Sequence, residues 1–460
     1  MPWRRVGTLS GKDNSLRIKR LPNAASDLQV LRVPSAGKRG LQWKAYRPVS
    51  PMQMPTLPET TVLVLAIGDG QPLMPLTARR TTAALPYAGN YRVIDFVLTN
   101  CMHSGLRRIN VLTQFNSLSL HNHVRDGWSI FNTDMGEFVN TVSPPITAEL
   151  SIYSGQTDAI CKNLYILEGA PDDTVLIISG EQIYRMDYAA MVDYHVRRGA
   201  DVTIAAIDSE TALGSCFPAS FEVREGDVPA IREHSPPAPL PREEGVYGPM
   251  GVFAFRRDCL IQCLKGLGND GARSQNLIDL IRRELTGRAR IGGYRFGGEF
   301  GRVSQDKYWR DLQSLDDFYQ ANMDLLKLEP PLDIYQADWP VRTYQQQRPP
   351  ARTVPGRSCN EGICVNSIVS GGTVIAGGGV SRSVLGNRVY IDDSAMVEDS
   401  ILFPGVTVGE GAQVRRVICD RNVHIPAGER IGIDPARDAE RFLVTEDGVV
   451  VIPAHHTFSS

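Results

Sequence analysis

The stretch "VLVLAIGDGQPLMPLT", residues 62–77, decides how this chain is interpreted. The apolar run from Thr61 to Ile67 is typical of a strand buried on both faces of a parallel sheet. The glycine-bearing loop after it is of the kind that cradles the phosphates of a nucleotide. Within that loop, however, Ile67 adds a branched side chain, Asp69 adds negative charge, and Pro72 has no N–H to donate. The stretch therefore predicts a fold and leaves open whether a nucleotide still binds there.

Strand and helix patterns alternate from residue 61 onward. Gly105 and Gly199 follow two of the helical patterns, as helix-ending residues do. The alternation implies an α/β domain with a Rossmann-like, mostly parallel sheet and right-handed crossovers. Ligands of such sheets bind at the carboxyl ends of the strands, where loop 67–77 and the residues after Gly180 would meet. The predicted strands are 61–67, 107–113, 174–180 and 201–207; the predicted helices are 94–104, 158–167, 188–198 and 277–285; and 235–246 is predicted to be a proline-rich surface loop.

Beyond residue 360 the chain has short Val/Ile groups separated by Gly, Ser and Asn. Aliphatic residues recur six positions apart in four pairs: Val374 and Val380, Ile391 and Val397, Val408 and Val414, Ile425 and Ile431. This period predicts a parallel β-helix whose coils stack aliphatic side chains. We therefore expect a basic, flexible extension at 1–58, the α/β domain at 59–328, a linker at 329–360 and the β-helix domain at 361–460.

Composition excludes several classes of protein. The net charge of −2 argues against a nucleic-acid binder, and no apolar run is long enough to span a membrane. The eight cysteines form no CxxC pair, so we expect mostly buried, reduced thiols rather than disulfides or metal ligands. Residues 1–50 hold eleven Lys/Arg against two Asp, without the apolar core of a secretory signal. We expect a loosely docked extension on a cytoplasmic, bacterial-like protein, with an organelle transit peptide as the alternative.

Several long motifs resemble the bacterial ADP-glucose pyrophosphorylases, or glucose-1-phosphate adenylyltransferases, over residues 60–453. That resemblance implies a nucleotidyltransferase domain followed by a left-handed β-helix. It also implies synthesis of ADP-glucose and pyrophosphate from ATP and glucose 1-phosphate with Mg²⁺, for glycogen or starch. Such enzymes are typically tetramers controlled by anionic sugar-phosphate or nucleotide effectors. The motifs are "NYRVIDFVLTNCMHSGLRRINVLTQ", "SLSLHNHVRDGWSIFN", "IYRMDY", "HVRRGADVTIA", "YWRDL", "LDIYQADWPVRTY" and "VNSIVSGGTVIAGG".

Transferred position by position, the resemblance assigns a site and reveals departures from it. The catalytic and metal-binding carboxylates would be Glu181, which replaces an aspartate, and Asp311. Nucleotide-binding positions would be Gly68, Gly70, Gln114 and Gly155; sugar-phosphate-binding positions would be Glu233, His234 and Trp309. The departures are Ile67 for glycine, Pro72 for arginine, Thr82-Ala83 for Lys-Pro, His234 for lysine, Ser274-Gln275-Asn276 for His-Asp-Phe and Gln313 for glycine.

These departures favour a non-catalytic or weakly active regulatory paralogue that forms a homo- or hetero-tetramer with a catalytic family member. The transition state is strongly anionic, and loss of a single donor typically costs about 10²–10³ in rate. Arginines that could hold an effector anion are Arg79, Arg80, Arg92, Arg415 and Arg416, although each taken singly is equally compatible with a structural role.

Two alternatives remain open. One is an active adenylyltransferase, or a sugar nucleotidyltransferase of other specificity, that uses Mg²⁺ held by Glu181 and Asp311 and is assisted by Glu233, Gln114 and Trp309. The other is an acyltransferase built on the β-helix, for which His424 is the histidine inside the repeat. A turn or surface role for His424 is favoured, because no acyl-donor pocket is recognisable in the sequence.

Overall fold

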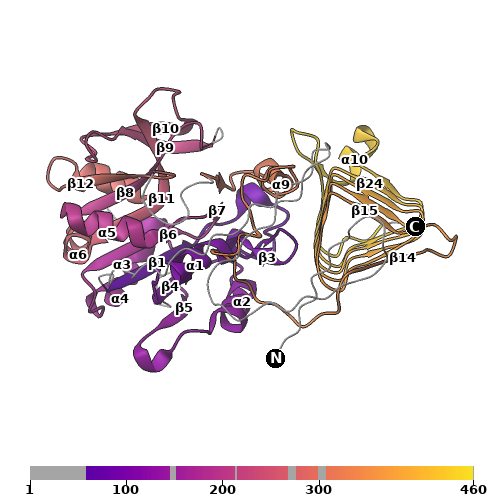
Figure 1. The fold of residues 1–460 in the computed structure, drawn as a ribbon. Coiled ribbons are helices and arrows are strands. Elements are labelled where there is room, and N and C mark those ends of the chain that lie inside the picture. The colour runs from indigo at the N-terminus through magenta and orange to yellow at the C-terminus, as the bar shows by residue number, and fades with distance from the viewer. Residues whose placement is uncertain (1–58, 146–151, 213–214, 268–275, 299–306, 459–460) are drawn as a thin grey trace, which may run out of the picture. The chain divides into compact units, whose positions relative to one another are not determined.

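A computed structural model of the chain describes residues 59–145, 152–212, 215–267, 276–298 and 307–458 (Figure 1). The predicted basic extension, 1–58, lies outside these residues, as do Ser274 and Gln275.

A nine-stranded sheet carries the nucleotidyltransferase-like part of the chain, in the order β10-β9-β11-β6-β1-β4-β5, with β8 and β12 joined through β11. Strand β1 (Thr60–Ala66) lies between β4 (Arg108–Thr113) and β6 (Thr174–Ser179), and pairs with both in parallel. Every residue of β1 is buried, as its apolar run predicts. The parallel part ends at β5 (Phe138–Val142). Helices that connect or cover these strands include α1 (Val93–His103), α2 (Leu118–Trp128) and α5 (Tyr188–Arg198).

The second part of this sheet is antiparallel, which strand–helix alternation did not indicate. Strand β11 (Val246–Arg256) runs antiparallel to β6, β8 (Val202–Ile207) and β9 (Cys216–Glu222), whereas β12 (Ile291–Arg295) is parallel to β8. The predicted loop 235–246 is wrong over its first five residues, because β10 (Ile231–Pro239) continues through them after a shift of register. Its prolines are tolerated there because β10 is an edge strand.

Two predicted helices are interrupted. Residues 158–167 form α3 (Gln156–Lys162) and α4 (Leu164–Glu168), separated by Asn163. The Asn163 side chain donates to the Ala159 carbonyl and the Tyr153 hydroxyl, so it competes with continued helix formation. Residues 277–285 form α8 (Leu277–Leu280) and then a wider π turn, Ile281–Leu285. Helix α6 is Arg257–Gly266.

The C-terminal part is a left-handed parallel β-helix, as predicted. Its three sheets stack successive coils in parallel (Figure 1), and the last strand of the third sheet, β28 (Leu443–Val444), runs antiparallel to β29 (Val450–Ile452). Of the eight aliphatics predicted to recur, seven are buried, whereas Val374 is half-exposed and Ile375 fills the interior instead. The strands are β14 (Arg352–Val354), β17 (Val374–Ala376), β20 (Tyr390–Ile391), β23 (Thr407–Val408) and β26 (His424–Ile425); β15 (Ile363–Val365), β18 (Gly379–Ser381), β21 (Met396–Glu398), β24 (Gln413–Arg415) and β27 (Arg430–Ile431); and β16 (Ile368–Val369), β19 (Val384–Leu385), β22 (Ile401–Leu402), β25 (Val417–Cys419), β29 (Val450–Ile452) and β28 (Leu443–Val444).

The sheet domain and the β-helix share an apolar core. Phe318 of α9 (Leu315–Asp324) meets Phe403 edge to face, with ring centres 6.0 Å apart. Leu73 and Phe96 belong to the same cluster. Among the residues described, no helix has the length and apolar character needed to cross a bilayer. All eight cysteines carry free thiols, and Cys359 and Cys364 are exposed rather than buried.

Candidate functional site

The predicted nucleotide site lies where three neighbouring parallel strands end. Gly68 follows β1, Gln114 follows β4, and Glu181 follows β6. The Gln114 amide donates to the Ile67 carbonyl at 3.0 Å and accepts from the Tyr153 N–H at 2.7 Å. The structure therefore brings these predicted residues together, with the Gln114 side chain engaged in holding the backbone of the loop.

The remaining predicted nucleotide-binding residues have structural roles in the structure. Gly70 adopts φ of +73°, a left-handed conformation that favours glycine, and its carbonyl accepts from the Thr77 hydroxyl at 2.6 Å. A side chain at Gly70 would also collide with Thr77. Gly155 precedes the first residue of α3. These glycines explain the turn of the chain without requiring a ligand.

The Glu181 carboxylate faces the glycine-bearing loop 67–77. Oε1 accepts a hydrogen bond from the Gly68 N–H at 3.1 Å. Burial is the largest influence and raises the pKa of Glu181 to about 7; the Gly68 bond acts in the opposite direction, and the nearby charges of Asp311 and Asp69 raise it further. The site thus gathers acidic groups where a triphosphate would need cations.

Asp311 ends β13 (Trp309–Asp311), which pairs with β7 (Gln182–Tyr184) beside Glu181. Burial raises the pKa of Asp311, and hydrogen bonds from Gln313 and Gln182 oppose that shift. The Gln313 amide donates to Asp311 Oδ2 at 2.8 Å and to the Cys216 carbonyl at 2.8 Å, and it accepts from the Cys216 N–H. Gln313, which stands where the resembling family has glycine, therefore ties Asp311 to strand β9.

One oxygen of Glu181 and one of Asp311 each accept a hydrogen bond from an amide N–H. The second oxygen of each carboxylate keeps lone pairs that could still ligate a cation. Within the described ranges, no third His, Cys, Asp or Glu joins them in a group that could hold a metal ion. Because Mg²⁺ is commonly held by one or two carboxylates together with waters and substrate phosphates, the metal site at Glu181 and Asp311 stays a prediction.

The predicted sugar-phosphate residues are engaged with protein groups. Glu233 forms an ion pair of 2.6 Å with Arg282, and His234 shares a hydrogen bond of 2.9 Å with the buried Ser220 hydroxyl. Trp309 is 1% exposed and stacks on Phe217, with ring centres 5.7 Å apart. Arg282, in the π turn Ile281–Leu285, is a cation that the sequence did not single out.

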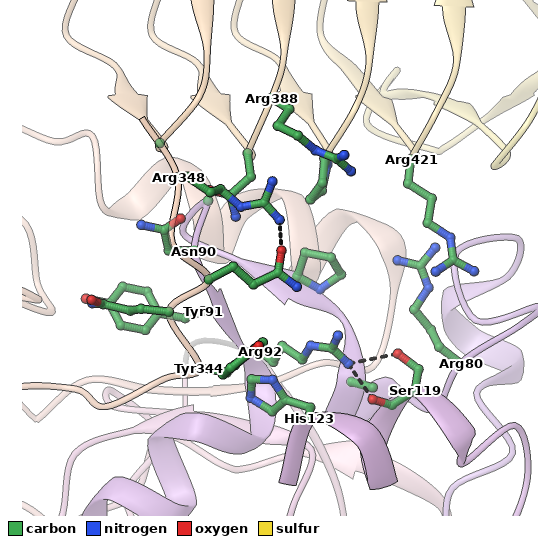
Figure 2. A pocket seen from close by; sticks show the side chains of 18 of the residues that line it. Arg80, Asn90, Tyr91, Arg92, Ser119, His123, Tyr344, Arg348, Arg388 and Arg421 are labelled. Carbon is green, nitrogen blue, oxygen red and sulfur yellow. Dashed lines mark hydrogen bonds between the residues drawn. The ribbon is translucent and has the colours of Figure 1, made fainter. Parts of the chain in front are cut away.

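A second site is a cavity of about 440 Å³ lined by five arginines from both parts of the chain. Figure 2 shows Arg421 reaching from the end of a β-helix coil toward Arg80, and Arg388 lying near Arg348. Arg348 comes from the predicted linker and bonds the Gln346 side chain. Polar and aromatic groups complete the lining, among them Asn90, Tyr91, Ser119, His123, Tyr344, Asn387 and Asn422.

The cavity carries positive charge that the protein itself compensates only in part. Arg80 pairs with Asp420 at 2.6 Å, and it is the one cavity arginine with an ion pair among the described residues. Burial lowers the pKa of Arg92 to about 10, with the charges of Arg80 and Arg421 adding to the shift against Asp95. The pKa of Arg421 is likewise lowered, by burial and then by Arg80. Such a cavity favours an anionic ligand.

The arginines form two groups. Arg348 has a lowered pKa through burial and then through the charge of Arg388, while Arg80, Arg92 and Arg421 influence one another. Strand register places the corners bearing Arg388 and Arg421 two coils apart, or about 10 Å at 4.8 Å per strand. The spacing suits a ligand with two anionic groups.

The structure therefore places only part of the predicted effector set in this cavity. Arg80 and Arg92 line it, whereas Arg79 is exposed outside it, Arg415 lies on the exposed face of β24, and Arg416 bonds the Asp447 carbonyl. Arg348, Arg388 and Arg421 were missed. Arg388 and Arg421 could have been found by following one corner of the β-helix through its repeat, since two coils separate them.

His424 stands on the outer face of β26, exposed, and its Nδ1 lies 2.5 Å from the Thr407 hydroxyl of the coil before it. Its position matches the surface role that the sequence favoured over acyl transfer.

Comparisons with known proteins agree with the fold. A nucleotidyl transferase family model matches residues 61–328, and a GlmU-like C-terminal hexapeptide model matches 349–452. The glucose-1-phosphate adenylyltransferase 2 of Vibrio cholerae is 42% identical over 407 residues, which cover 87% of this chain and 99% of that protein. Glucose-1-phosphate adenylyltransferases of Nitrosospira multiformis (36% over 393 residues; 85% of this chain and 92% of that protein) and Yersinia pseudotuberculosis (37% over 406 residues; 86% and 94%) are also similar. The chain belongs to the glucose-1-phosphate adenylyltransferase family.

Proposed function

We propose that this chain is a non-catalytic or weakly active regulatory member of its family. The observation that carries the proposal is the acidic character of the candidate site: Asp311 and Asp69 lie close enough to Glu181 to act on it electrostatically, where a triphosphate would need cations. Pro72 adds neither charge nor N–H in the loop, and His234 replaces a permanent cation. Several such losses together would leave little or no turnover, even though their effects are far from additive.

The regulatory half of the proposal rests on the arginine-lined cavity. A sugar phosphate or nucleotide with two anionic groups would bind between Arg348 and Arg388 at one end and Arg80, Arg92 and Arg421 at the other. Because the cavity is lined by the sheet domain and by the β-helix, a ligand there would bias how the two pack. The chain would transmit that bias to a catalytic relative within a homo- or hetero-tetramer.

An active adenylyltransferase is the second candidate. It is favoured by one observation, the convergence of Gly68, Gln114, Glu181 and Asp311 at the carboxyl ends of parallel strands, where ligands of such sheets bind. In that case ATP and glucose 1-phosphate would be the substrates. Asp311 and Glu181 would hold Mg²⁺ through the carboxylate lone pairs that their amide hydrogen bonds leave free.

Pyrophosphate release separates the two candidates. The full-length chain at high concentration would be given ATP, glucose 1-phosphate and Mg²⁺, alone and then mixed with an active relative. The regulatory proposal expects silence alone and a shifted effector response in the mixture. Turnover by the chain alone that is lost in Asp311→Asn would establish the active alternative, and silence with an unaltered mixture would refute regulation.

A further inference from the structure

The contact between Glu181 and Gly68 does more than satisfy one backbone group. Gly180 donates its N–H to the Leu65 carbonyl at 2.8 Å, so the ends of β6 and β1 are held side by side. The Glu181 carboxylate then lies flat against Gly68: a Cβ built on that glycine would be 2.6 Å from both carboxylate oxygens. No second anion fits at this backbone N–H while Glu181 stays there.

A carboxylate is chemically suited to that position. Backbone N–H groups in a glycine loop at the end of a strand bind oxyanions, most often phosphates. A glutamate side chain supplies an oxyanion of its own, and its additional methylene gives it longer reach than the aspartate of the resembling family. Asp311 and Asp69 are close enough to Glu181 to influence it electrostatically, so the surroundings are negative as well.

We propose that Glu181 is a built-in occupant of the phosphate loop and excludes the phosphates of a nucleotide from it. This inference deepens the proposed loss of catalysis and rests on it. The chain would be kept free of ATP by an internal contact, in addition to the substitutions in the loop itself.

The loop cannot relieve this contact by moving away. Its backbone is fixed on the near side by the Gln114 amide on the Ile67 carbonyl, at 3.0 Å. On the far side it is fixed by the Thr77 hydroxyl on the Gly70 carbonyl, at 2.6 Å. Ile67 also packs against a buried apolar cluster. Entry of a phosphate therefore requires the Glu181 side chain to leave.

The test is ATP binding to the full-length chain by calorimetry, in EDTA so that metal binding does not contribute. Every protein carries Arg388→Gln and Arg421→Gln, which weaken the arginine-lined cavity as a competing anion site. In this background we expect no saturable binding at millimolar ATP. Glu181→Ala should bind ATP saturably, with a Kd at least about tenfold below the limit that the background protein sets, because both the occupant and its charge are gone. Glu181→Gln, which keeps an acceptor for Gly68 but no charge, should fall in between.

Glu244→Ala is the matched control. Glu244 is exposed in the connection between β10 and β11, so its removal should leave ATP binding unchanged. If Glu181→Ala does not fold, Glu181→Gln and Glu181→Asp decide the matter. Unchanged affinity in the folded Glu181 variants overturns the inference, as does ready ATP binding by the background protein. Turnover is scored separately: a silent chain whose Glu181 variants gain no affinity refutes the internal occupant and leaves the non-catalytic proposal standing.

Discussion

Arg80 and Asp420 lie 340 positions apart in the sequence and form an ion pair almost free of solvent, with side chains 4% and 1% exposed. One guanidinium nitrogen contacts both carboxylate oxygens, at 2.6 and 2.7 Å. A buried pair of this kind is weak evidence for net stability, because desolvation offsets the attraction. Removing one partner is different, because it leaves a buried charge without compensation.

Asp420→Asn should therefore lower the apparent free energy of unfolding by about 3 kcal/mol, since Arg80 keeps its charge and loses its counter-ion. Urea denaturation followed by tryptophan fluorescence measures the change. Arg197→Gln is the control: it removes an exposed pair with Asp193, whose side chains are 76% and 36% exposed, and it should cost no more than about 0.5 kcal/mol. Equal effects of the two substitutions would mean that the Arg80 pair is solvated.

His195 supplies a pH dependence. It is 3% exposed, its Nδ1 lies 2.8 Å from the Thr203 hydroxyl, and burial lowers its pKa to about 4. Between pH 6.5 and pH 4 the unfolded chain takes up a proton that the folded chain refuses, so stability falls as the pH falls. From pH 7.5 to pH 5 the loss from this residue is about 2 kcal/mol, at 1.36 kcal/mol per pKa unit. His195→Gln should reduce the difference in the free energy of unfolding between pH 7.5 and pH 5 by that amount, as measured by urea titration at each pH. An unchanged difference would contradict the assignment to His195.

At the residue scale, sequence reasoning found side chains that stand next to a recognisable strand end. Glu181 and Gln114 belong to this group, because the carboxyl ends of parallel strands converge wherever such a sheet forms. It did not find Arg348, which has no local pattern. Arg421 shares a corner of the repeat with Arg388, but that this corner faces the sheet domain depends on how the β-helix packs on it. The hydrogen bond from Gln313 to Asp311 was not predicted either, because it depends on the rotamer of Gln313 rather than on a sequence pattern.

At the scale of elements, the six-residue period predicted the β-helix well and its first coil less well. The inward column runs through Ile375, Ile391, Val408 and Ile425, which the strand register aligns. Val374 keeps the period with Val380 and yet faces outward, because a shift of one residue exchanges the two faces of a strand. The break of α3 from α4 at Asn163 similarly reflects a side-chain bond to the backbone that periodicity does not register.

The inward column makes a stability prediction. Ile391 is 0% exposed, with a neighbouring coil above and below it, so Ile391→Ala should destabilise the protein by about 2–5 kcal/mol through lost burial and a residual cavity. Thermal unfolding of the full chain measures this. Met396→Ala, on the outward face and 47% exposed, is the control and should stay within about 0.5 kcal/mol. If Ile391→Ala costs no more stability than Met396→Ala, the coil must collapse to fill the cavity left by the Ile391 side chain.

At the scale of the whole molecule, the shared core and the arginine-lined cavity belong to the same junction. Arg80 of the cavity and Phe403 of the core connect them: the Arg80 guanidinium lies over the Phe403 ring, 5.6 Å from its centre, and Phe403 also meets Phe318 of α9. Apolar burial holds the two parts together, and the arginines repel one another across the same boundary. An anion that enters the cavity would relieve that repulsion without any change in the core.

This arrangement predicts anion-linked stability. A ligand with two phosphate groups, such as a sugar bisphosphate, should raise the thermal midpoint, and at one hundred times its Kd the linkage amounts to about 2.7 kcal/mol.

Arg388→Gln removes a charged donor with no competing ion pair among the described residues, so it should weaken binding about tenfold, as loss of one charge-assisted hydrogen bond does. Arg415→Gln is the matched control, because it removes the same charge from the outer face of β24. Calorimetric titration at two salt concentrations measures both variants. Equal weakening by the two substitutions would mean that the ligand senses only the overall charge of the β-helix, whereas loss confined to Arg388→Gln would assign the anion to the cavity between the sheet domain and the coils.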